Sequence, residues 1–202
     1  ALSAIAISWN PGFGGGHDGG SRQELREGAW TEASKILTDS IRVLAYNIHH
    51  GEGMDEVVDL ERIAALIREV DPDLVALQEV DSVTGRTGGV DQAAELGRLT
   101  GLTPIFGRFM AYDGGAYGMA ILSRFPVSRS RNLRLPDGDE PRSALHATVT
   151  SPTSGRRVEF VGIHLYRTEG ERLAQAAHLG EILSNLEGPV ILAGDFNSQP
   201  GS

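Results

Sequence analysis

An α/β fold with a mixed sheet is predicted by three features of this 202-residue sequence. Short β-rich apolar runs alternate with segments whose apolar residues recur at helical spacing. Two neighbouring runs, 144–150 and 157–163, are joined only by "SPTSGR", which is typical of an antiparallel hairpin. The apolar content of 40% is enough for the core of one domain.

The compact domain is expected over residues 40–202, after a flexible glycine-rich segment over residues 1–39. Residues 10–20 read "NPGFGGGHDGG", and glycine loses the most backbone entropy on ordering, which favours a linker or loop. A phosphate-binding loop fits less well, because no apolar strand precedes these glycines and no GK[ST] follows them. Whether residues 1–39 belong to another domain stays open.

Each expected strand is a short apolar or β-branched run between turn residues. The segment "IRVLAYN" is rich in β-formers, and "LVALQ" is a continuous apolar run of the kind found in a buried strand. The runs "MAILS", "ALHATVT", "RVEFVGI" and "VILAG" follow along the chain. The expected strands cover residues 41–47, 74–78, 119–123, 144–150, 157–163 and 190–194.

Helices are expected where apolar residues recur every three or four positions. One runs from the region of Val57 to Val70, with Asp55 or Asp59 as its N-cap and Pro72 beyond its end. A short helix follows over residues 93–99 and is stopped by a glycine. A longer one, marked by leucines and alanine over residues 173–186, is closed by a Gly-Pro pair.

Polar side chains follow the ends of several expected strands. The strand 41–47 ends in Asn47, the strand 74–78 is followed by Glu79, and the last strand delivers Asp195 and Asn197. Ligands of open α/β sheets commonly bind off strand ends, and Mg²⁺ prefers a few oxygen ligands plus water. His164, also at a strand end, can donate a hydrogen bond to a phosphate oxygen. Singly, each residue is more often a cap, a turn residue or a core residue.

The motifs together resemble the endonuclease/exonuclease/phosphatase superfamily, whose members are similar to deoxyribonuclease I. The signatures run in the family's order from about residue 41 to the end of the chain. They are "RVLAYNIHHG", "DLVALQEVD", "GGAYGMAILSRFPV", "EPRSALHATV", "FVGIHL" and "VILAGDFNSQP". "LQEVD" alone is weak, but the ordered set indicates the fold.

The resemblance implies a four-layer α/β sandwich of two mixed sheets and metal-dependent cleavage of phosphate esters. It assigns the metal, Mg²⁺ or alternatively Mn²⁺, to Asn47, Glu79 and Asp195. It gives catalytic roles to His164, which would bond the scissile phosphate, and to Asp195, which would orient or deprotonate the attacking water. Asn197 would bind phosphate or metal beside Asp195.

The family's pattern also includes a Ser-Asp-His signature after "GDFN", which this sequence does not contain. We therefore expect a domain that is incomplete at its C-terminus, lacks its last strands, and is weakly active or inactive as a phosphodiesterase, nuclease or phosphatase. A non-catalytic binding module on the same fold is the alternative. Met119, where many relatives have Asn, is expected to fill core space.

Several other residues are interpreted as structural. Arg142 could meet phosphate, but a surface pair with Glu140 is favoured. Arg86 is interpreted as a solvated side chain. His49 and His50 directly follow Asn47, but loop histidines are usually without a role and they are left out of the predicted site.

Composition limits the partners. With 18 Lys and Arg against 27 Asp and Glu, the net charge of −9 argues against broad electrostatic binding of nucleic acid. The substrate is expected to be a phosphate ester in a nucleic acid, a phospholipid headgroup or a small phosphodiester.

No apolar run approaches the roughly 20 residues of a membrane span, so stable insertion into a membrane is not expected. A monomer is expected. Without cysteines, the compartment stays open between cytoplasmic and secreted.

Overall fold

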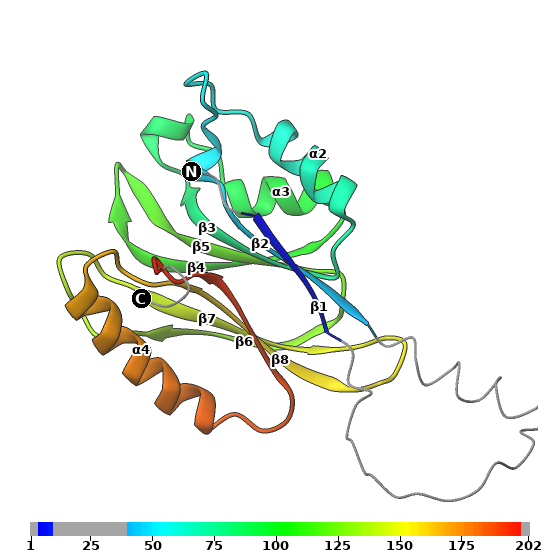
Figure 1. The fold of residues 1–202 in the computed structure, drawn as a ribbon. Helices are drawn as coiled ribbons and strands as arrows, with labels where there is room; N and C mark the ends of the chain where they lie inside the picture. Colours follow the sequence, from blue (N-terminus) through cyan, green and yellow to red (C-terminus); the bar gives the residue numbers. More distant parts are fainter. Residues whose placement is uncertain (1–3, 10–39, 199–202) are drawn as a thin grey trace, which may run out of the picture.

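Strands pair into two mixed sheets in the computed structural model, which describes residues 4–9 and 40–198 (Figure 1). The first sheet has the order β1 (Ala4–Trp9), β2 (Ile41–Asn47), β3 (Leu74–Ser82), β5 (Gly115–Ser123) and β4 (Thr103–Tyr112). The second has the order β6 (Val127–Arg134), β7 (Ser143–Thr150), β8 (Arg157–His164) and β9 (Val190–Asp195). The pairs β2–β3 and β8–β9 are parallel, and the other neighbours are antiparallel.

The helices cover the outer faces of the two sheets. In Figure 1, α2 (Leu60–Val70) and α3 (Gln92–Thr100) lie over the first sheet, and α4 (Glu169–Ser184) lies over the second. Two short 3-10 turns, η1 (His49–Gly51) and η2 (Gly85–Thr87), follow β2 and β3. The order helix, sheet, sheet, helix is the four-layer sandwich that the family resemblance implies. None of the described helices is long and apolar enough to cross a membrane.

Local signals set the helix ends. The Asp59 carboxylate accepts hydrogen bonds from the backbone amides of Glu61 and Arg62 at 3.0 and 3.1 Å, so Asp59 rather than Asp55 caps α2. Gly101 ends α3 in a left-handed conformation with φ +72°. The helix α4 ends earlier than expected, at Ser184.

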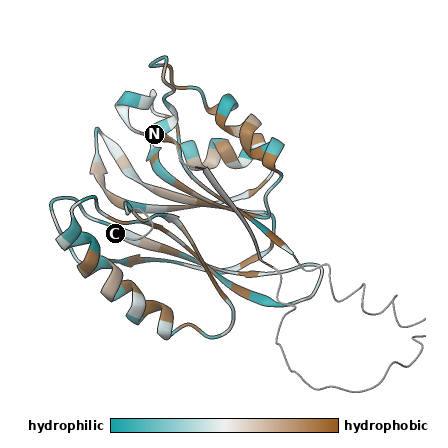
Figure 2. Ribbon diagram, in the orientation of Figure 1, coloured by the Kyte–Doolittle hydropathy of each residue, from teal (hydrophilic) through white to brown (hydrophobic). Residues whose placement is uncertain are grey.

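Three apolar layers hold the sandwich together. The central layer lies between the sheets and contains Phe160, Met119 and Ile121, all fully buried. A second layer joins the first sheet to α2 and α3, and a third joins the second sheet to α4. Figure 2 shows apolar residues along the strands and on the helix sides that face them. Met119 fills core space, as expected.

The structure adds strands that the sequence did not predict. The strand β6 lies at the edge of its sheet and is mostly exposed, so it lacks an apolar run. The strand β4 contains Pro104 and Gly107, which weaken its sequence signal. Residues 4–9 form β1 inside the segment where a flexible lead was expected, and β1 pairs antiparallel with β2. The rest of that segment lies outside the described residues, and the boundary at residue 40 stays a prediction.

A buried carboxylate lies near the start of β8, at the opposite end of this strand from His164. Glu159 accepts a hydrogen bond from Thr148 Oγ1 at 2.6 Å and pairs with His146 Nε2 at 2.7 Å. Burial raises the pKa of Glu159, but the hydrogen bonds from Thr148 and His146 outweigh it and hold this pKa below its ordinary value. The carboxylate therefore stabilises the fold above pH 4.5 and loses this contribution as the pH falls through the folded-state pKa.

Replacing Glu159 by Gln should make the free energy of unfolding less dependent on pH. At pH 7 we expect a loss of about 1–3 kcal/mol, because charged hydrogen bonds are lost. Between about pH 5 and 3, stability should fall less steeply in the variant than in the wild type. Urea unfolding across this range measures both, with the exposed Glu187→Gln as control. Equal pH dependence in Glu159→Gln and wild type would contradict the assignment.

Candidate active site

Asn47 and Glu79 come together because β2 and β3 are parallel neighbours. Asn47, the last residue of β2, lies opposite Gln78. The register between β3 and β5 shifts between Gln78 and Val80, so Glu79 lies in a β-bulge with φ +57°. The strand thus continues past Glu79 to Ser82, where the sequence predicted an end at Gln78. The Asn47 Nδ2 donates to Glu79 Oε1 at 2.7 Å and orients its carboxylate.

His164 and Asp195 meet in the same way on the second sheet. They are directly opposite in the parallel pair β8–β9, and His164 Nε2 lies 3.8 Å from Asp195 Oδ2. His164 is only 3% exposed. Burial lowers the pKa of His164, and the positive charge of Arg142 lowers it further, whereas Asp195 and Glu79 raise it. His164 is therefore neutral at neutral pH, and the carboxylates of both sheets act on it.

Asn197 supports Asp195 from the loop after β9. Its backbone amide donates to Asp195 Oδ1 at 2.8 Å, and its φ of +49° is left-handed. The side-chain Nδ2 donates to the Leu165 carbonyl at 2.7 Å. The side-chain nitrogen thus fixes Asn197 against the chain after β8, and the backbone amide of Asn197 positions the Asp195 carboxylate.

Arg142 was missed by the sequence analysis as a member of the site. It pairs with Glu140 as expected, but the pair is not on the surface, because Arg142 is only 4% exposed. Its guanidinium lies 5.2 Å from the ring centre of Phe109 and 5.4 Å from that of Tyr166. The motif "EPRSAL" is present in the sequence, but the burial of Arg142 comes from the aromatic rings of Phe109 and Tyr166 on other segments.

Buried nitrogen atoms without hydrogen-bond partners occur at this site. In the described part of the chain, three buried side-chain nitrogen or oxygen atoms lack a hydrogen-bond partner. They are Arg142 Nε, His146 Nδ1 and His164 Nδ1. Two of these three belong to the neighbouring residues Arg142 and His164. The charge of Arg142 acts on the His164 imidazole, and buried polar groups are normally paired, so these two nitrogens can each still accept a further polar contact.

Glu79 forms part of two adjoining pockets. One has a volume of about 390 Å³ and is lined also by Asn47, His49 and Glu52. The other has a volume of about 210 Å³, and its wall includes His49, His50, Glu79, Arg86, Met110, Tyr112, Tyr117 and Glu140. Glu79 therefore contributes to the walls of both pockets.

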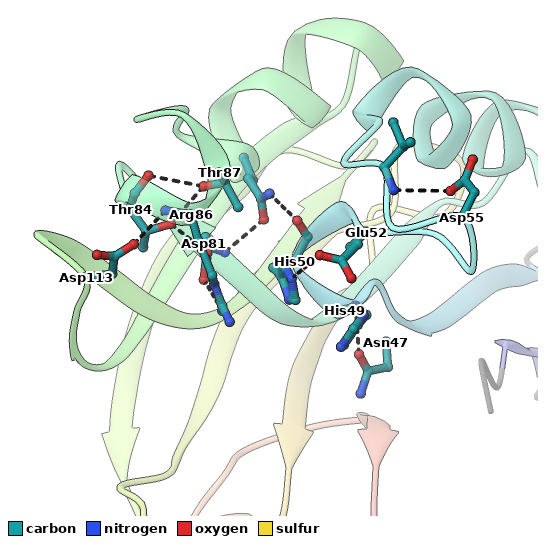
Figure 3. Close-up of polar contacts among 12 residues, drawn as sticks. Asn47, His49, His50, Glu52, Asp55, Asp81, Thr84, Arg86, Thr87 and Asp113 are labelled. Atoms are coloured by element: carbon teal, nitrogen blue, oxygen red, sulfur yellow. Dashed lines mark hydrogen bonds and ion pairs between the residues drawn. The ribbon is translucent and has the colours of Figure 1, made fainter.

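Arg86 is fixed in the wall of the smaller pocket and is not the solvated side chain that the sequence suggested. Its Nε and Nη2 donate to the two oxygens of Asp81 at 2.6 and 2.7 Å, and Asp81 is fully buried (Figure 3). The guanidinium lies 4.5 Å from the ring centre of Tyr112. The backbone amide of Arg86 donates to Asp113 at 2.6 Å.

The residues predicted to hold the metal offer oriented oxygen donors on both sheets. Glu79 and Asp195 are half-buried carboxylates, and each is oriented by a hydrogen bond, from the Asn47 side chain and from the Asn197 backbone respectively. Such oxygen donors suit Mg²⁺ or Mn²⁺.

The family model of the Endonuclease/Exonuclease/phosphatase family matches residues 44–202. The chain belongs to this family. Its members hydrolyse phosphoric esters and generally depend on divalent metals. The resemblance found in the sequence motifs is thereby confirmed.

Individual relatives agree with this assignment. The chain is 31% identical over 169 residues to the uncharacterized protein YbhP of Escherichia coli (strain K12), covering 78% of this chain and 67% of that protein. It is 26% identical over 185 residues to inositol phosphosphingolipids phospholipase C of Schizosaccharomyces pombe, covering 79% and 42%.

A solved structure supports the fold. The crystal structure of an endonuclease/exonuclease/phosphatase from Beutenbergia cavernae has a TM-score of 0.65 and 29% identity, covering 78% of this chain and 47% of that one. This chain therefore spans about half the length of that protein. The two mixed sheets with covering helices match this deoxyribonuclease I-like sandwich.

The structure places the predicted site residues in two pairs, one on each sheet. Asn47 bonds Glu79 on the first sheet, and His164 lies beside Asp195 on the second, with Asn197 behind it. Their metal-binding and catalytic roles stay predictions. The additions from the structure are Arg142, the fixed Arg86 and the His49–His50 turn.

Replacing Arg86 by Ala should destabilise the protein strongly, because it leaves the buried Asp81 carboxylate without its charged partner. We expect a loss of about 3–5 kcal/mol in the free energy of unfolding, measured with urea. The matched control is Arg98→Ala, which removes an exposed pair with Glu95 and should cost less than about 1 kcal/mol. Similar losses in both variants would contradict the importance of the buried pair.

Proposed function

We propose that this chain carries the site of a divalent-metal-dependent hydrolase of phosphate esters. The observation that carries the proposal is that two oriented carboxylates, one from each sheet, both act on the buried His164, where buried side-chain nitrogens lack partners. Glu79 and Asp195 supply oxygen ligands, while Arg142 Nε and His164 Nδ1 lack partners among the described residues. A metal-bound phosphate would complement both sets, since it offers negative oxygens to the cation and to the donors.

In this proposal, separate residues hold the metal and the phosphate. Asn47, Glu79 and Asp195 would hold Mg²⁺ or Mn²⁺. When bound, such a cation neutralises charge on phosphoryl oxygens and lowers the pKa of a bound water. Asn47 keeps the Glu79 carboxylate in place through its 2.7 Å hydrogen bond.

The phosphate itself would be held from the second sheet. The neutral His164 has one ring N–H to donate, and Arg142 adds a positive charge in a buried setting where charges interact strongly. Asp195, held by the Asn197 amide, would orient or deprotonate the attacking water. Positioned donors of this kind stabilise the charge of the transition state.

A phosphodiester is the substrate class we propose. The Schizosaccharomyces pombe relative is named as a phospholipase C for inositol phosphosphingolipids, which places a diester headgroup within the chemistry of a relative. The net charge of −9 disfavours tight binding of duplex nucleic acid, so a small or headgroup diester is favoured.

A non-catalytic binding module on the same fold is the second candidate. Glu79, Arg142 and His164 suffice to hold a metal-bound phosphate without turnover. Calorimetric Mg²⁺ binding that depends on Glu79, in a chain that does not hydrolyse diesters, would favour this candidate.

The metal assignment is tested by Glu79→Gln, which removes one charge but keeps the shape of the side chain. We expect Mg²⁺ affinity, measured by calorimetry, to fall at least about tenfold, equivalent to 1.4 kcal/mol. Any metal-dependent turnover of bis-p-nitrophenyl phosphate should disappear as well. Glu69→Gln, on the exposed side of α2, is the control. Unchanged Mg²⁺ affinity in Glu79→Gln would refute the site.

The phosphate assignment is tested by Arg142→Met, which keeps the buried packing but removes the charged donor. Loss of a charged hydrogen bond of about 1.5–3 kcal/mol should weaken binding of inorganic phosphate in the presence of Mg²⁺ by about 10- to 100-fold. Calorimetry measures this affinity, with Arg129→Met on the exposed edge strand β6 as control. Equal phosphate affinity in Arg142→Met and wild type would contradict the role.

A further inference from the structure

A cluster of two imidazoles and one carboxylate lies on η1 and directly after it, beside the oxygen donors of the proposed active site. The ligand atoms of His49, His50 and Glu52 all lie within 4.8 Å of one another. His50 Nε2 is 3.3 Å from Glu52 Oε2, and the two imidazole rings have their centres 4.4 Å apart (Figure 3). Three potential ligands thus gather within four consecutive residues.

The backbone brings the two imidazoles together by an unusual conformation. Successive side chains of a strand point to opposite faces, but His49 and His50 both have left-handed φ values, +47° and +44°. Such values cost non-glycine residues about 1–2 kcal/mol each, so the surroundings must enforce them.

Hydrogen bonds from two neighbouring elements fix this turn. The His49 amide donates to Asn47 Oδ1 at 3.0 Å, and the His50 carbonyl accepts from Gln92 Nε2 at 2.6 Å. Gln92 in turn accepts from the Asp81 amide at 2.9 Å, which ties the turn to β3. The cluster is therefore pre-formed.

The cluster is also accessible. His49 lines both pockets, Glu52 lines the larger one, and His50 lines the smaller one. His49 is exposed and Glu52 is half-buried, so an ion can enter from solvent and keep water in a remaining coordination position.

The donor types decide which ion the cluster would take. Two imidazoles with one carboxylate suit Zn²⁺ and similar borderline metals, whereas Mg²⁺ prefers oxygen ligands alone. We propose that His49, His50 and Glu52 form a second metal site, selective for a divalent transition metal such as Zn²⁺ and separate from the Glu79 site. With three protein ligands it keeps an open position, unlike a closed structural zinc site.

Zinc binding to the full chain tests this site without any reference to hydrolysis. Zn²⁺ affinity is measured by competition with a chromophoric chelator, and Co²⁺ substitution reports coordination through its visible absorption. His49→Ala and Glu52→Gln should each weaken Zn²⁺ binding by about tenfold or more and reduce the Co²⁺ absorption. Both side chains reach solvent, and circular dichroism verifies that the variants stay folded.

Two control variants separate this cluster from other sites. His178→Ala removes an exposed histidine that lies 3.2 Å from Glu181, a comparable His–Glu pair on α4, and should leave Zn²⁺ affinity unchanged. Glu79→Gln should weaken Mg²⁺ binding but retain the zinc site.

The outcomes distinguish this proposal from the proposed function. Unchanged Zn²⁺ affinity in both His49→Ala and Glu52→Gln overturns the second site. Loss of Zn²⁺ binding in Glu79→Gln alone also overturns it, because the ion then occupies the site of the oxygen ligands. A chain that binds Zn²⁺ through His49 but shows no Glu79-dependent Mg²⁺ binding would keep this proposal and end the proposed function.

Discussion

The close approach of the two sheets below the strand ends is the constraint on which the site depends. Gly162 on β8 faces Met119 on β5, and a Cβ at Gly162 would lie only 2.5 Å from the end of the Met119 side chain. Met119 is paired with Gln78, next to Glu79, and Gly162 precedes His164 by two residues. The spacing set by this contact therefore determines how near the two polar pairs of the active site lie.

The active site contains carboxylates and a guanidinium, which shift the pKa of His164 in opposite directions. Carboxylates from both sheets raise the pKa of His164, while burial and Arg142 lower it more. In an acidic chain, the buried Arg142 supplies positive charge where general electrostatics does not. The arrangement can therefore attract an anion locally, although the molecule as a whole repels polyanions.

Sequence reasoning found the parts of the structure that are encoded locally. Buried strands such as β3 and β8 appear as apolar runs, and the polar residues at strand ends, Asn47 and Asp195, can be read directly after them. The edge strand β6 could not be found in this way, because its solvent-exposed residues carry no apolar pattern.

The parts of the site that sequence reasoning missed depend on contacts between distant segments. Arg142 is buried by Phe109 and Tyr166, and Arg86 is held by Asp81 and Tyr112. The turn at His49 depends on Asn47 and on Gln92 across the chain. Secondary-structure propensities and residue spacing along the sequence do not reveal which distant segments come into contact.

Because Glu79 lies in a β-bulge, the position of its carboxylate depends on the register between β3 and β5. In a regular strand, Glu79 would alternate with Gln78 and Val80, both of which are buried, and the one extra residue breaks this alternation. Removing that residue would shift all later pairings of β3 by one step of about 3.3 Å and invert the faces of its side chains. Insertions or deletions within β3 are therefore more damaging to the carboxylate's placement than most substitutions around it.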